Sequence, residues 1–178
     1  ADCKPVGNQW IKKMVQRLQG DKELVVGYGA YLKEKGLLNR WIRFDTAQNA
    51  LLYLTRAKRG KAYMGVGRNL SYKKDLFFRN KGFSSMNHIP GGDDDLFINK
   101  VATKKNTGIV IDRDAFTLSE APKSLGEWWR QKSRHYSTAR YYKSSHKFLL
   151  SSYALSYFLF YPLMVLSILF YNWKLSIA

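Results

Sequence analysis

Apolar and polar positions follow two periods along most of the chain. Apolar residues spaced about 3.6 positions apart predict helices over residues 10–18, 47–57, 71–77, 93–105 and 126–136. Short apolar runs predict strands over residues 23–28, 62–66 and 107–111, and the polar, glycine-containing segment 33–39 is expected to be a loop. Because predicted strands and helices alternate, we expect an α/β layer structure.

A long uncharged run dominates the C-terminal part. Residues 148–173 contain no charged side chain and are bracketed by Lys147 and Lys174. A bilayer core needs about 20 apolar residues in a helix, and aromatic residues at both ends of the run suit headgroup depth. Pro162 lies inside the run, where a membrane helix tolerates a kink. We therefore predict a transmembrane helix over 148–173; the alternative is a buried core helix.

Charge changes this picture. The chain has 178 residues, with 30 Lys and Arg against 13 Asp and Glu and a formal net charge of +17. Such an excess favours a phosphate-bearing partner: nucleic acid, an anionic membrane or a nucleotide. Basic residues crowd the flank before the apolar run, where Glu127 is the single acid, so we expect residues 1–147 to be a cytoplasmic domain. The one cysteine, Cys3, excludes a disulfide-stabilised scaffold.

Three clusters carry candidate chemistry. The first is Gly91-Gly92-Asp93-Asp94-Asp95. Three adjacent carboxylates repel one another, so such a cluster binds a cation, provides a general base or caps a helix. The cluster alone does not decide between these roles.

The second cluster is Tyr63-Met64-Gly65-Val66-Gly67-Arg68-Asn69. Two glycines after a predicted strand indicate a close approach of the backbone to a ligand, or a plain turn at the end of the strand. A dinucleotide fingerprint needs a third glycine and a helix directly afterwards, and Arg68-Asn69 stands there instead.

The third cluster lies on the predicted helix 126–136. Gln131 and Arg134 are three residues apart and share a face, which suits a clamp on a diphosphate. The alternative is an amphipathic helix on a membrane surface.

Taken in order, these clusters resemble the second half of a membrane-bound family-2 glycosyltransferase of the cellulose-synthase-like kind. Ala1-Asp2-Cys3-Lys4-Pro5 resembles the end of an Asp-x-Asp motif, residues 63–69 the glycine-containing strand, and Lys81-Gly82-Phe83 a following glycine–phenylalanine motif. Residues 93–95 stand for the acidic motif, and Gln131-Lys132-Ser133-Arg134-His135 for a Gln-x-x-Arg-Trp helix in which His135 replaces Trp. The resemblance covers essentially the whole chain and implies the second half of a type A glycosyltransferase fold followed by a transmembrane helix.

The resemblance also implies roles. Asp2 would bind Mg²⁺ or Mn²⁺, and an acid among residues 93–95 would be the general base. Alignment on Leu96 favours Asp93, whereas alignment on the turn near Asn106 favours Asp94 or Asp95; we choose Asp94. The residues expected to bind substrate are Gly65, Gly67, Asn69, Gln131, Arg134 and His135.

The expected function is transfer of a sugar from a nucleotide-sugar donor to a glycan or lipid-linked acceptor at the inner (plasma) membrane. We expect this chain alone to be incomplete and inactive, because the resemblance puts half of the donor site in a preceding segment. The alternative is a non-enzymatic, membrane-anchored basic module that binds anionic lipid or nucleic acid. The order of the motifs argues against that module and against a nucleic-acid partner.

Overall fold

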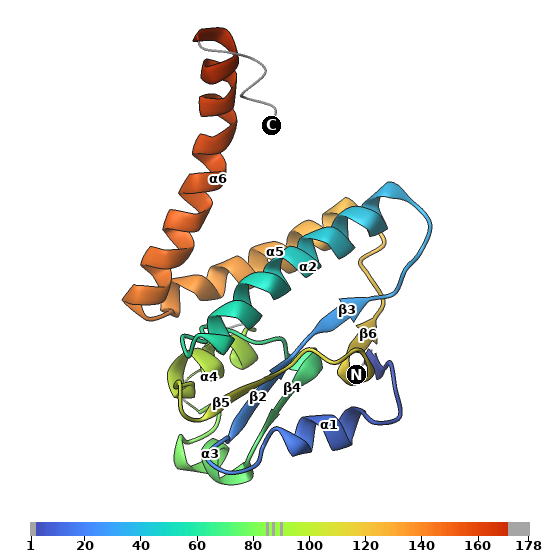
Figure 1. The fold of residues 1–178 in the computed structure, drawn as a ribbon, viewed down its shortest axis with the longest axis vertical. Helices are drawn as coiled ribbons and strands as arrows, with labels where there is room; N and C mark the ends of the chain where they lie inside the picture. Colours follow the sequence, from blue (N-terminus) through green and yellow to red (C-terminus); the bar gives the residue numbers. More distant parts are fainter. Residues whose placement is uncertain (1–2, 85, 87, 90, 171–178) are drawn as a thin grey trace. The chain divides into compact units, whose positions relative to one another are not determined.

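The protein is a mixed α/β structure with two small sheets and one long apolar C-terminal helix (Figure 1). The computed structural model describes residues 3–84, 86, 88, 89 and 91–170. Contacts divide the chain into two compact units, Ala1–Tyr141 and Tyr142–Ala178.

One sheet is built around β2 (Leu24–Gly27), whose four residues are all buried. This strand pairs antiparallel with β4 (Leu70–Tyr72) and parallel with β5 (Thr107–Val110). An apolar run buried on both faces is typical of a central strand, which explains the continuous Leu-Val-Val sequence.

The other sheet has β6 (Thr117–Ser119) at its centre, between β1 (Cys3–Pro5) and β3 (Gly29–Tyr31). The β1–β6 pair is antiparallel and the β3–β6 pair is parallel. Tyr28 alone separates β2 from β3, and its ring meets the ring of Phe116 edge to face at 5.0 Å. Between β2 and β3 the chain therefore passes from one sheet to the other through a single residue.

Helices cover the sheets on different sides (Figure 1). Their bounds are α1 (Trp10–Gln16), α2 (Leu37–Lys58), α3 (Lys74–Arg79), α4 (Asp93–Val101) and α5 (Leu125–Thr138), with short 3₁₀ turns at Gly67–Asn69, Arg113–Ala115 and Ala139–Tyr141. Met14 of α1 packs against Val25, Val110 and Ala115. The helices α2 and α5 lie side by side, and Lys132 of α5 forms an ion pair with Asp45 of α2.

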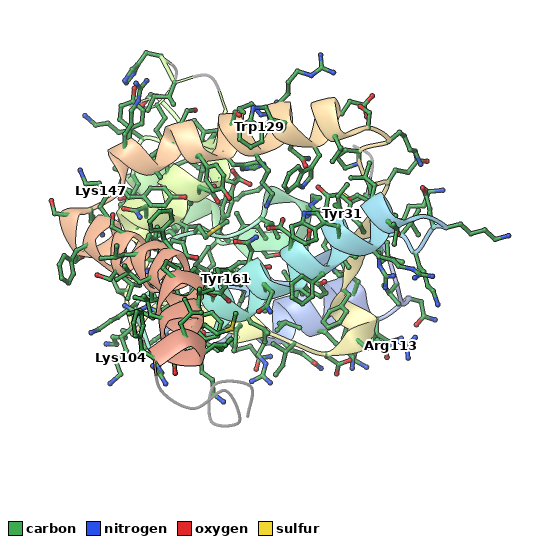
Figure 2. The ribbon with its side chains drawn as sticks, turned by 90° about the horizontal axis from the view of Figure 1, so that it is seen from above. Tyr31, Lys104, Arg113, Trp129, Lys147 and Tyr161 are labelled. Carbon is green, nitrogen blue, oxygen red and sulfur yellow. The ribbon has the colours of Figure 1, made fainter. Side chains whose placement is uncertain are left out.

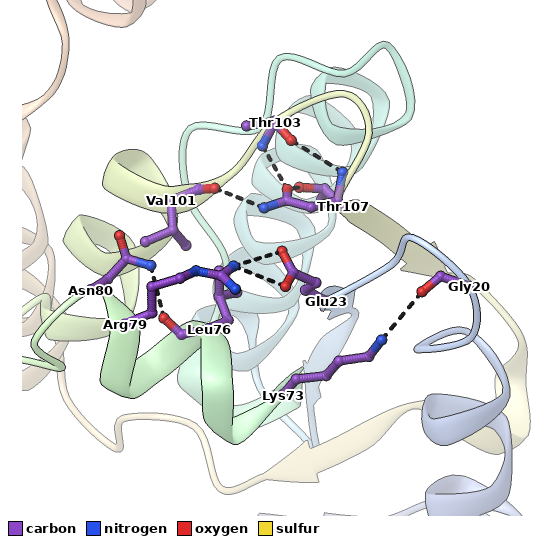
Figure 3. Close-up of polar contacts among 10 residues, drawn as sticks. Gly20, Glu23, Lys73, Leu76, Arg79, Asn80, Val101, Thr103 and Thr107 are labelled. Carbon is purple, nitrogen blue, oxygen red and sulfur yellow. Dashed lines mark hydrogen bonds and ion pairs between the residues drawn. The ribbon is translucent and has the colours of Figure 1, made fainter.

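Polar contacts fix the beginning of β2 (Figure 3). Both carboxylate oxygens of Glu23 accept hydrogen bonds from Arg79 Nη2, at 2.9 and 3.1 Å. The Arg79 hydrogen bond is the main cause that holds the pKa of Glu23 below its usual value, although partial burial of the carboxyl acts in the opposite direction. Close by, an aromatic cluster of Tyr72, Phe77, Phe83 and Phe97 fills the space between β4, α3 and α4.

Several elements predicted from the sequence are confirmed. The helices predicted at 10–18, 47–57 and 126–136 correspond to α1, α2 and α5, and the strands predicted at 23–28 and 107–111 correspond to β2 and β5. The helix predicted at 93–105 ends at Val101, and its apolar residues Leu96, Phe97, Ile98 and Val101 are all buried.

Three predictions are wrong. Residues 62–66 form no strand, because Asn99 Nδ2, rather than a neighbouring strand, donates to the Tyr63 carbonyl oxygen at 3.0 Å. The helix predicted at 71–77 begins only at Lys74, as α3, since Ser71 and Tyr72 belong to β4 and pair with β2. The predicted loop 33–39 ends early, because α2 begins at Leu37.

The second unit contains α6 (Ser144–Phe170), a helix of 27 residues with Pro162 inside it. Its length and composition are sufficient to cross a membrane, and none of its residues is buried in protein. The last residues of the predicted span, 171–173, lie outside the described residues.

Candidate functional site

The acidic cluster forms the first turn of α4. Gly91 and Gly92 precede it with φ values of 88° and 74°, a left-handed conformation that glycine adopts without steric cost. All three aspartates stand where the helix dipole favours negative charge. The turn also gives each carboxylate a different environment, so the three acids are not equivalent.

Asp94 is hydrogen-bonded to the 3₁₀ turn at Gly67–Asn69. Its Oδ2 accepts a hydrogen bond from the backbone N–H of Gly67 at 2.5 Å, and its Oδ1 accepts one from Asp95 N at 2.9 Å. A Cβ atom at residue 67 would lie 2.9 Å from Asp94 Oδ2. The second sequence cluster and the acidic cluster are therefore in direct contact, although 27 residues separate Gly67 from Asp94.

The other two acids differ in exposure. Asp95 is 2% exposed, and its Oδ2 lies 3.9 Å from Nδ1 of His135. Asp93 is exposed and lines a small pocket of about 220 Å³. The pocket is lined by Gly67, Leu70, Tyr72, Phe83, Asp93, Asp94 and Phe97.

This pocket combines two carboxylates with aromatic rings. Burial, with a smaller contribution from the charge of Asp93, raises the pKa of the Tyr72 hydroxyl above its usual value. Aromatic faces beside hydrogen-bond acceptors suit a ligand with both apolar faces and hydroxyl groups, as a sugar ring has.

Gly65 and Asn69 of the glycine segment, which is residues 63–69, are buried. Asn69 is fully buried; its Nδ2 donates to the carbonyl oxygens of Tyr28 and Ala115, and its Oδ1 accepts from Trp10 Nε1. Gly65 is buried as well, and a Cβ there would lie 2.4 Å from Ile98 Cδ1. Both residues shape the turn from inside, whereas Gly67 is exposed at the pocket; substrate contacts by Gly65 and Asn69 stay predictions.

The helix α5 reaches the same region from another side. The Arg134 side chain packs against Gly91, where a Cβ would lie 3.2 Å from Arg134 Cδ. Ser124 caps the helix by accepting a hydrogen bond from Glu127 N, as expected of a serine at this position. The structure thus brings Arg134 and His135 to the start of α4.

Gln131 faces a second group of residues. Its Oε1 accepts a hydrogen bond from the hydroxyl of Tyr31 at 3.2 Å, and the guanidinium of Arg68 lies 4.2 Å from the centre of the Tyr31 ring. Tyr31 and Arg68 were missed by the sequence analysis. Arg68 had a signal, because it lies inside residues 63–69, whereas Tyr31 lies on β3, a strand that the apolar pattern did not predict.

The described residues do not fit a metal site. Among residues 3–84, 86, 88, 89 and 91–170, no three His, Cys, Asp or Glu side chains gather in a way that could hold a metal ion. Asp2, the expected ligand of Mg²⁺ or Mn²⁺, lies outside the described residues. The expectation of a metal therefore rests on the resemblance alone.

Comparison with known proteins adds no assignment: neither a protein-family model nor a curated protein matches the chain. The contacts among the chain's own residues therefore carry the functional argument.

Proposed function

We propose that this chain is the C-terminal part of the catalytic domain of a membrane-bound glycosyltransferase. It would transfer a sugar from a nucleotide-sugar donor to a hydroxyl group of a glycan or lipid-linked acceptor. The carrying observation is the meeting of three distant segments around the start of α4: Gly67 donates to Asp94, Arg134 packs against Gly91, and His135 lies beside Asp95. These are the segments that carry the resemblance.

Asp93 suits the role of general base better than Asp94. Both oxygens of Asp94 already accept backbone hydrogen bonds. Asp93 is exposed and lines the pocket, and within the described part of the chain no hydrogen bond or ion pair engages its carboxylate. A base must reach the proton that it removes, so accessibility decides between the two. Asp94 then acts as a positioning residue that holds the Gly67 turn.

The proposed reaction is a displacement at the anomeric carbon. Asp93 takes the proton of the acceptor hydroxyl, the oxygen forms a bond to the anomeric carbon, and the bond from that carbon to the diphosphate breaks. The nucleoside diphosphate leaves with the bonding electrons. Arg134 is the proposed cationic contact for a phosphate, because guanidinium geometry matches phosphate oxygens. Gln131 is proposed as a hydrogen-bonding contact for the same group.

The proposal includes Mg²⁺ or Mn²⁺ as a cofactor, because the resemblance implies that Asp2 binds such an ion. A divalent ion bound there would neutralise charge on the leaving diphosphate. None of the steps above depends on it. The proposed location is the inner membrane, with the catalytic part in the cytoplasm; α6 supplies the helix long enough to cross.

The test is nucleotide release by the full-length protein in detergent, with Mn²⁺ and a panel of nucleotide-sugars. We expect Asp93→Asn to lower turnover by roughly 10²–10⁴-fold, the contribution of a general base, with nucleotide binding retained. The matched control is Asp75→Asn, which changes an exposed aspartate in the first turn of α3 and should leave turnover unchanged.

Two results would overturn the proposal. Turnover unaffected by Asp93→Asn would remove the assigned base. Absence of release from every donor, together with binding to nucleic acid that falls steeply with salt, would favour the basic-module hypothesis instead.

A further inference from the structure

The outward face of α2 is apolar. Leu37, Trp41, Phe44 and Leu51 are 58–81% exposed and recur at the spacing of one helix face. The opposite face, which contacts the sheets, carries the buried residues Asn39, Ile42, Ala50, Tyr53 and Ala57. The outward face of an ordinary surface helix is polar, so the apolar outward row of α2 is unusual.

The helix α5 repeats the pattern. Leu125, Trp129 and Tyr136 are 66–67% exposed and also share one face. Trp128 and Gln131 point inward, toward Ile42 and Tyr31. Since successive helical residues are about 100° apart, Trp129 lies on the outward side of this helix.

The two apolar rows lie on neighbouring helices. The Lys132–Asp45 ion pair joins α5 to α2 laterally, and Figure 2 looks down onto both helices, with Trp129 labelled on α5. The seven residues of these rows are called the outer stripe: Leu37, Trp41, Phe44, Leu51, Leu125, Trp129 and Tyr136. Two neighbouring exposed apolar rows of this kind mark an interaction site.

Charge and residue type favour a lipid surface as the partner. Arg40 lies beside the row on α2, and the exposed Arg130 follows Trp129 directly on α5. Two of the seven stripe residues are Trp and one is Tyr, which are the residues that settle at the boundary between headgroups and acyl chains. Basic residues beside an apolar row complement anionic headgroups.

The path of the chain supports the same partner. Ser144, the first residue of α6, follows Thr138, the last residue of α5, by six residues. Six residues span at most roughly 20 Å when extended. A bilayer crossed by α6 therefore begins within that length of chain from the end of α5.

We propose that the outer stripe is a second, non-spanning membrane contact, which lays α2 and α5 on an anionic bilayer surface. The contact does not depend on glycosyl transfer, and it would serve a non-enzymatic protein equally well. It assigns a partner to α2, which the function proposed above does not use.

The experiment locates single side chains relative to the bilayer. The chain is placed in nanodiscs of phosphatidylcholine with phosphatidylglycerol, in a Cys3→Ser background, with a nitroxide on Trp41→Cys. Collision with oxygen reports lipid contact, and collision with a water-soluble nickel chelate reports water contact. The matched control is Phe78→Cys on α3, where the native side chain is 71% exposed.

We expect the oxygen-to-nickel collision ratio at position 41 to exceed that at position 78 several-fold. In nanodiscs of phosphatidylcholine alone, the ratio at position 41 should fall. Equal ratios at the two positions would overturn the membrane contact, and protection of position 41 from both reagents would mean that protein covers it instead. An equal ratio at position 41 in nanodiscs with and without phosphatidylglycerol would overturn the proposed preference for anionic headgroups. A label on Trp129→Cys repeats the measurement on α5, so failure of one variant to fold leaves the test intact.

Discussion

Asn69 lies against Gly27 so closely that a Cβ atom at residue 27 would stand 2.6 Å from Asn69 Nδ2. The buried amide of Asn69 bridges the carbonyl oxygens of Tyr28 and Ala115, at 2.9 and 2.7 Å. It thereby ties the glycine segment to the junction between the two sheets. Glycine at position 27 leaves the space that this bridge needs.

Replacing Asn69 should therefore weaken the whole first unit. Asn69→Leu keeps the volume but leaves buried polar groups without partners, so we expect a loss of about 2–4 kcal/mol in the free energy of unfolding. Denaturant unfolding of the chain in detergent, followed by tryptophan fluorescence, measures it. Asn8→Leu is the control at an exposed asparagine and should change stability by less than about 0.5 kcal/mol. Similar stabilities of the two variants would contradict the bridging role of Asn69.

The contact between Gly67 and Asp94 makes a second prediction. Gly67→Ala places a methyl group against Asp94 Oδ2, so the carboxylate must move away from the turn. On the proposed function, nucleotide release by the full-length protein should fall about tenfold to a hundredfold, because small misplacements of reacting groups are costly. The control Gly126→Ala meets nothing within 4 Å and should retain full activity. Full activity of Gly67→Ala would show that the turn does not position the site.

The Glu23–Arg79 pair predicts a pH dependence of stability (Figure 3). The pKa of Glu23 is lowered in the folded protein, so the pair stabilises the fold above the ordinary glutamate value of 4.5. That stability is lost as the pH falls through the lower, folded-state pKa. Because Arg79 is 58% exposed, we expect Glu23→Gln to cost less than about 1 kcal/mol at pH 7.

The check is thermal unfolding of wild type and Glu23→Gln between pH 7 and pH 3. The difference between them should shrink below pH 4.5. A difference that is constant across this range would mean that the ionised carboxylate is not what stabilises the pair.

The hydrogen bond from the Tyr31 hydroxyl to Gln131 is expected to position the Gln131 side chain. Tyr31→Phe removes the hydroxyl that donates to Gln131 Oε1 and keeps the ring under Arg68. We expect nucleotide release to fall about twofold to tenfold, the rate equivalent of one neutral hydrogen bond. Tyr141→Phe removes a hydroxyl from an exposed tyrosine and is the matched control. Loss of folding stability without a change in kcat would assign Tyr31 a purely structural role.

The spacing of apolar residues along the chain predicted helices with one buried face and strands that are buried on both faces. The apolar residues of α4 repeat at helical spacing and its acids sit at the favourable end, so both its position and its inward face were predictable. The buried run of β2 was predictable for a similar reason.

Non-local pairing explains most of what was missed. The three-residue strands β1, β3 and β6 owe their conformation to partners up to 116 residues away, as in the pair of Cys3 and Ser119. No local pattern can reveal such a partner. The start of α2 was missed for a different reason: Leu37, Trp41 and Phe44 face outward, so the apolar period that marks a buried face does not begin there.

The candidate site was predictable as a set of segments but not as a geometry. Sequence order suggested that residues 63–69, 93–95 and 131–135 act together, and the contacts of Gly67 with Asp94 and of His135 with Asp95 join them. The distinct environments of the three adjacent aspartates depend on the α4 turn and on what surrounds it. Spacing along the chain therefore could not rank them.

The position of β6 has a consequence during synthesis. Because β6 lies between β1 and β3, this sheet cannot close until residue 119 has been made. The apolar helix α6 follows soon afterwards, from Ser144. Domains generally fold as units while the chain grows from its N-terminus. Closure of this sheet and synthesis of α6 thus fall within the same short interval of translation, and a pause in that interval would expose both an open sheet edge and a long apolar helix.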